Sequence, residues 1–78
     1  MGKKLDKVVG TQIQLLRISK GWSQEYLAEK SHLHRTYISQ IERGLKSPSI
    51  RVLFQISSAL EVPMSELIKM VEDFLGAE

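Results

Sequence analysis

Apolar residues along this chain recur at the three- to four-residue spacing of α-helices in five separate stretches. These stretches cover residues 5–20, 24–30, 35–43, 50–60 and 64–75. Between them stand residues that end or cap helices, namely Gly21, Ser23, Gly44, Ser49 and Pro63. The pattern predicts an all-α fold of five helices in one domain that spans residues 1–78.

The second and third predicted helices are joined by very few residues, within the sequence QEYLAEKSHLHRTYISQIER from Gln24 to Arg43. Helices connected by so short a turn must cross at a steep angle, which is the geometry of a helix-turn-helix unit. Ala28 has the small side chain that a crossing helix needs, and His32 is expected to take a left-handed backbone at the corner.

The third predicted helix has a polar face opposite Ile38 and Ile41. On a helical wheel this face holds Arg35, Thr36, Ser39, Gln40 and Arg43. Arginine and glutamine can make paired hydrogen bonds to guanine and adenine edges in the major groove, and a threonine methyl can pack on thymine. An ordinary solvated helix face is the alternative interpretation, and the polar pattern alone favours it.

The distribution of charge favours the DNA interpretation. The net charge of the chain is +2, but residues 1–51 carry +6 and residues 52–78 carry −4. The basic part contains the predicted helix-turn-helix, so a phosphate backbone would attract that half and repel the other.

The fifth predicted helix carries more apolar residues than a domain of this size can bury. Leu67 is expected to close the core of the monomer, and the other apolar positions are expected to be exposed unless a second chain covers them. The predicted homodimer interface, on residues 64–75, consists of Met64, Ile68, Val71, Phe74 and Leu75. The alternative is that this helix folds back on its own domain.

The stretch from about Val8 to Ile68 resembles the Cro/cI-like (XRE) helix-turn-helix family. The combination of SQEYLA with YISQIERG carries the resemblance, and the HRTYIS segment with the short helical tail is similar to controller proteins of restriction-modification systems. The resemblance implies a five-helix lambda-repressor-like DNA-binding domain. His32 and Glu61 depart from the family pattern, which has glycines at those corners.

The resemblance also implies roles for individual residues. Base contacts are expected from Arg35, Thr36, Ser39 and Gln40. Phosphate contacts are expected from Ser23, Gln24, His34, Tyr37, Arg43 and Lys46. Arg17 and Glu42 match a pair that in relatives ties the first helix to the end of the third, which would be a structural ion pair.

These observations predict a dimeric, sequence-specific transcriptional regulator that binds a two-fold symmetric operator on double-stranded DNA and controls restriction-modification genes, its own included. The alternative is a phage or plasmid repressor, or an antitoxin whose last helix binds a protein partner. RNA polymerase is a possible further partner. The expected location is the bacterial cytoplasm, in association with the nucleoid.

Catalysis and cofactors are not expected. The chain has no cysteine and no glycine-rich phosphate loop, and it is too short to enclose a substrate pocket beside a core. A zinc site at His32 and His34 would lack further ligands. No apolar run approaches the length of a transmembrane helix.

Overall fold

The computed structural model describes residues 2–77, and within them all regular structure is helical. The five helices are α1 (Gly2–Ser19), α2 (Gln24–Ser31), α3 (Arg35–Glu42), α4 (Ile50–Ala59) and α5 (Met64–Gly76). They confirm the predicted all-α fold and its order, although α1 begins at Gly2 rather than at Leu5. Met1 and Glu78 lie outside the described residues, and Glu78 is one of the acidic residues counted in the charge of residues 52–78.

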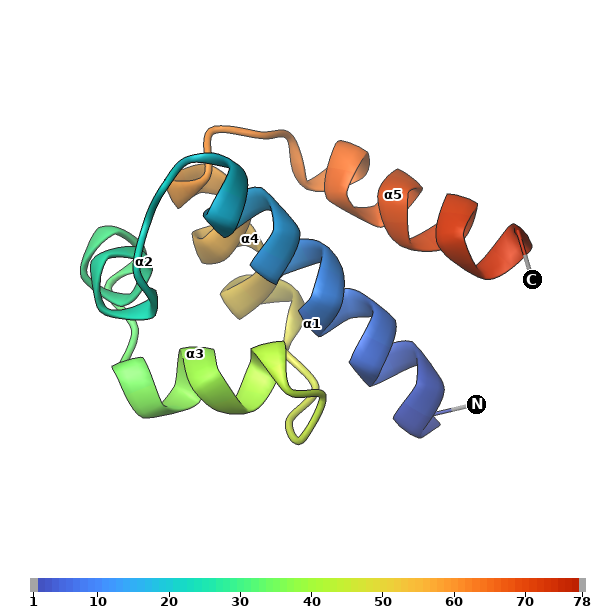
Figure 1. Ribbon diagram of the computed structural model, residues 1–78, viewed down its shortest axis with the longest axis horizontal. Coiled ribbons are helices and arrows are strands. Elements are labelled where there is room, and N and C mark those ends of the chain that lie inside the picture. The colour runs from blue at the N-terminus through green and yellow to red at the C-terminus, as the bar shows by residue number, and fades with distance from the viewer. Residues whose placement is uncertain (1, 78) are drawn as a thin grey trace.

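α1 is the central helix, and it packs against α3 on one side and against α5 on the other (Figure 1). α2 contacts α3 and α4, and α4 contacts α5. The core between the helices consists of Ile13, Leu27, Ala28, Ile38, Ile41, Leu53, Ile56, Leu60 and Leu67. Trp22, in the connection after α1, packs against this core. The arrangement leaves α3 and α5 on opposite sides of α1.

The crossing of α1 over the end of α3 depends on Gly10, which the sequence analysis did not identify. A Cβ atom at this position would overlap the carbonyl oxygen of Ile41 and would lie 2.7 Å from the carbonyl oxygen of Glu42. The two backbones are therefore in direct contact, and only glycine allows so close an approach.

Two corners take a left-handed backbone at residues other than glycine. His32 ends α2 with a φ of 60°, and Glu61 follows α4 with a φ of 61°. The expected left-handed corner at His32 is thus confirmed. Ser23 and Ser49 act as the predicted caps, because their hydroxyls accept hydrogen bonds from the N–H groups of Tyr26 and Val52.

The expectation that the apolar positions of α5 other than Leu67 are exposed is wrong for two of them. Val71, which was expected on the exposed stripe of α5, is only 4 % exposed, and Met64 packs against the core. Both side chains pack within their own chain, because α5 lies along both α1 and α4. Conversely, Ile50 belongs to the apolar spacing of α4 but is 70 % exposed, since it lies in the first turn, beyond the edge of the core.

Candidate nucleic-acid interface

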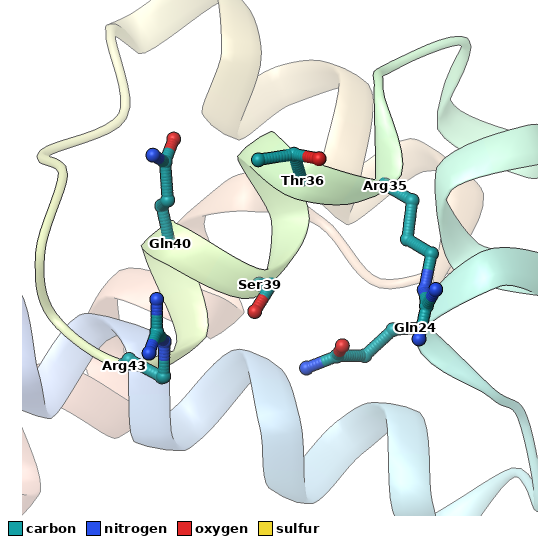
Figure 2. A pocket seen from close by; sticks show the side chains of 6 residues that line it. All are labelled: Gln24, Arg35, Thr36, Ser39, Gln40 and Arg43. Carbon is teal, nitrogen blue, oxygen red and sulfur yellow. The ribbon is translucent and has the colours of Figure 1, made fainter.

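The polar face of α3 borders a shallow depression at the surface of the protein (Figure 2). The depression has a volume of about 290 Å³ and is lined by Gln24, Arg35, Thr36, Ser39, Gln40 and Arg43. Arg35, Thr36 and Arg43 are exposed, whereas Ser39 and Gln40 are half-buried. The structure therefore brings together the four side chains expected at bases and two of those expected at phosphates.

The opposite face of α3 is fully occupied by the core. Ile38 and Ile41 have no exposed surface, and Glu42 is 3 % exposed. Because this side of α3 faces inward, Arg35, Thr36, Ser39 and Gln40 lie together along its opposite side, at the depression. A helix held in this way presents a fixed row of side chains of the length that fits a major groove.

The N-terminus of α2 adds a site for an anion next to this row. Ser23 caps α2 through a hydrogen bond of 3.0 Å from the N–H of Tyr26 to its hydroxyl. The first N–H groups of a helix have no partner within the helix, and together with the helix dipole they favour a bound phosphate. Gln24, the first residue of α2, faces the depression beside Arg35 in Figure 2.

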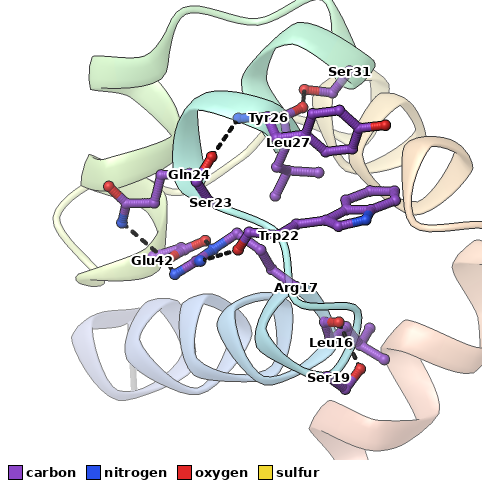
Figure 3. Close-up of polar contacts among 10 residues, drawn as sticks. All are labelled: Leu16, Arg17, Ser19, Trp22, Ser23, Gln24, Tyr26, Leu27, Ser31 and Glu42. Carbon is purple, nitrogen blue, oxygen red and sulfur yellow. Dashed lines mark hydrogen bonds and ion pairs between the residues drawn. The ribbon is translucent and has the colours of Figure 1, made fainter.

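A buried ion pair holds Gln24 in place. Arg17 and Glu42 lie in contact, with hydrogen bonds of 2.7 Å from Nε to Oε2 and 3.0 Å from Nη2 to Oε1. Arg17 also donates a hydrogen bond of 2.6 Å from Nη1 to the carbonyl oxygen of Trp22. The Gln24 amide donates a hydrogen bond of 3.0 Å to Oε1 of the same carboxylate (Figure 3). One carboxylate therefore joins α1, the start of α2 and the end of α3.

His34 and Tyr37, both expected at phosphates, also have contacts within the chain. His34 caps α3, because its Nδ1 accepts a hydrogen bond of 3.2 Å from the N–H of Thr36. The ring of Tyr37 packs against the core. Lys46 is exposed in the connection after α3, outside the residues that line the depression. Phosphate contacts from these three residues stay predictions.

Within residues 2–77 no cluster of three or more histidine, cysteine or acidic side chains could hold a metal ion. The same residues include no helix with the length and apolar character needed to cross a membrane.

Comparisons with known proteins agree with this geometry. The model of the helix-turn-helix family HTH_3 matches residues 13–67. The chain is 41 % identical over 69 residues to the control protein C.BamHI of Bacillus amyloliquefaciens. The aligned region covers 87 % of this chain and 85 % of that protein. The chain is also 38 % identical over 76 residues to the HTH-type transcriptional regulator SlrR of Bacillus subtilis. That alignment covers 91 % of this chain and 50 % of SlrR. This chain thus spans about half the length of SlrR.

Among solved structures, the restriction-modification controller protein C.Esp1396I is similar over most of the fold. Its wild-type crystal structure gives a TM-score of 0.82 at 40 % identity and covers 88 % of each chain.

Proposed function

The chain belongs to the HTH_3 helix-turn-helix family, and on this premise we propose that it is a sequence-specific transcriptional regulator that binds DNA as a two-fold symmetric dimer. The observation that supports this proposal most directly is the row of outward-facing polar side chains on α3, which shares one depression with Gln24 of α2. In this arrangement α3 enters the major groove while the start of α2 meets the phosphate backbone.

The residues on α3 have the chemistry for reading bases. Arg35 donates two hydrogen bonds to a guanine, and Gln40 pairs with an adenine edge. Thr36 offers its methyl group to a thymine methyl, and Ser39 accepts or donates a hydrogen bond at either kind of base pair. These four side chains are free to do so because the core is built from the other side of the helix.

Phosphate contacts fix the protein on the duplex. Gln24 keeps one amide hydrogen available after its bond to Glu42, since a primary amide carries two. Ser23 lies next to it at the helix N-terminus, and Arg43 extends the same surface at the end of α3. Lys46, His34 and Tyr37 complete the proposed set of phosphate contacts.

The names of two relatives support a proposal for the class of target genes. C.Esp1396I is named as a restriction-modification controller protein and C.BamHI as a control protein, and both are matched over most of their length. We therefore propose that this chain controls restriction-modification genes, including its own, from an operator with two half-sites about 10 base pairs apart. Contact with RNA polymerase and a place in the bacterial cytoplasm at the nucleoid belong to the same proposal.

In vitro selection from random duplex DNA with the purified protein, near physiological salt, tests the proposal. We expect recovery of a two-fold symmetric motif whose half-sites lie about one helical turn apart. The motif should also occur beside the gene for this protein. Recovery of no motif would contradict sequence-specific binding, and recovery of a single half-site would contradict binding as a dimer.

A further inference from the structure

The start of α1 carries lysines where helix physics disfavours them. The dipole at a helix N-terminus favours acidic side chains, yet the first turn of α1 has none, and Lys3 and Lys7 stand in its first two turns. The two lysines are four residues apart, a spacing at which like charges repel on a helix. Within residues 2–77 their exposed side chains make no hydrogen bond or ion pair. Local costs of this kind are typical of functional positions.

Lys7 lies directly beside the connection that follows α3. A Cβ atom at Gly44 would be 2.9 Å from the Cα atom of Lys7, so the two backbones are in contact there. Lys3, Lys7 and Gly10 lie on one side of α1, because spacings of four and three residues match the helical repeat. Gly10 packs on the carbonyl oxygens at the end of α3. The two lysines therefore continue from this crossing past the end of α3, toward the N-terminus (Figure 1).

This position joins the two lysines to the cations already proposed at phosphates. Arg43 lines the depression, and the blue ribbon of α1 passes next to it in Figure 2. Lys46 is exposed in the connection that Lys7 contacts. We call Lys3, Lys7, Arg43 and Lys46 the basic edge. Asp6, the only acidic residue of α1, is half-buried and offsets one of these four charges.

We propose that Lys3 and Lys7 bind the phosphate backbone of DNA beside the groove that α3 enters, an inference that rests on the proposed function. A basic surface continuous with a base-reading helix fits the phosphates of the same duplex, because the two sugar-phosphate strands border the major groove. Lysine suits this contact, since its ammonium group is a point charge on a flexible stem. Bound phosphates would also offset the repulsion between the lysines and the unfavourable helix dipole.

Neutral substitutions of exposed lysines test the proposal without disturbing the core. The variants are Lys3→Gln, Lys7→Gln and the double variant. Lys30→Gln is the matched control, because it removes the same charge from α2, where Lys30 lies 5.6 Å from the ring centre of Tyr26 and faces a hollow shared with Phe54 of α4. Thermal unfolding monitors the fold, and titrations of the selected site at several salt concentrations measure affinity. Ethylation interference identifies the phosphates that the protein contacts.

We expect the double variant to bind every sequence more weakly and to keep its base preference. Each contact between a lysine and a phosphate contributes about 0.9 to the slope of log affinity against log salt, so the slope should fall by about 1.8. The midpoint of thermal unfolding should equal or exceed that of the wild type, because repulsion at the helix N-terminus is removed. Phosphates whose ethylation weakens the wild type through Lys3 and Lys7 should no longer affect the double variant.

Three results would each overturn the proposal. They are an unchanged slope in the double variant, an equal fall of the slope in Lys30→Gln, and the same set of interfering phosphates in the wild type and the double variant. If the wild type selects no motif but the double variant still lowers the slope on duplex DNA of any sequence, the basic edge stands and the proposed sequence-specific function fails.

Discussion

The side-chain amide of Gln24 donates a hydrogen bond of 3.0 Å to the carboxylate of Glu42, which ties the first residue of α2 to the last residue of α3. The same carboxylate pairs with Arg17, and its side chain is only 1 % exposed. The residue proposed to hold a phosphate is thus oriented by a buried group that cannot itself reach DNA.

Removal of the Glu42 carboxylate should destabilise the fold strongly. Glu42→Ala leaves the Arg17 guanidinium buried without its partner, and we expect a loss of about 3–5 kcal/mol in the free energy of unfolding. Urea denaturation measures it. Asp73→Ala is the control, because its bond to Lys69 lies in solvent and should change stability by less than about 1 kcal/mol. Similar losses in both variants would contradict the structural role of the buried pair.

The hydrogen bond between Gln24 and Glu42 should also affect the affinity for DNA. We expect Gln24→Ala to weaken binding on all sequences by about 1.5–3 kcal/mol, because a hydrogen bond to a charged phosphate is lost. In a Glu42→Gln background the same substitution should cost less, since a neutral amide oxygen holds the Gln24 amide more weakly than the carboxylate does. A double-mutant cycle of dissociation constants measures the difference. Equal costs in the two backgrounds would show that Glu42 does not orient Gln24.

Arg35→Ala should relax the base preference at one position of each half-site. The expected cost is about 1–3 kcal/mol on the preferred sequence and much less on a sequence substituted at that position, because a paired contact to guanine is lost. Competition binding with operators substituted one base pair at a time measures it. A uniform loss over all sequences would assign Arg35 to the phosphate backbone instead.

Arg43→Ala should weaken all sequences equally. Loss of one phosphate contact lowers the slope of log affinity against log salt by about 0.9. Titrations at several salt concentrations measure this slope. Lys69→Ala on α5 is the control cation far from α3, and its slope should equal that of the wild type. A changed base preference in Arg43→Ala would mean that the roles of Arg35 and Arg43 are reversed.

Gly10→Ala should force α1 away from α3. The added Cβ would meet the carbonyl oxygens of Ile41 and Glu42, which are backbone atoms and cannot turn aside. We expect a loss of about 1–3 kcal/mol in stability, measured by thermal unfolding. Gly76→Ala is the control, because a Cβ there would meet nothing within 4 Å. A stable Gly10→Ala protein would mean that the two helices can separate without cost.

Much of the fold could be predicted because its determinants are local. Helix boundaries followed from apolar spacing, from the caps Ser23 and Ser49 and from Gly21. The polar face of α3 was also predicted, since the angular position of each residue around a helix follows from its number alone.

The features that could not be predicted from the sequence depend on how the helices pack against one another. Gly10 lies inside a regular helical stretch, and nothing in its neighbours signals that another backbone approaches it. Val71 was misjudged because helical spacing shows which residues share a face but not how far the core extends along it. The bond from Gln24 to Glu42 joins residues of two helices, and the family resemblance pointed only to Arg17 as the partner of Glu42.

The separation of the two faces of α3 has a consequence for how such proteins diverge. The side chains of Arg35, Thr36, Ser39 and Gln40 make no hydrogen bond within residues 2–77, while Ile38, Ile41 and Glu42 hold the helix in place. The outward residues can therefore be exchanged with little effect on folding. A duplicated gene could acquire a new target site through a few substitutions in one short helix, and the two copies could then regulate different genes without cross-reaction.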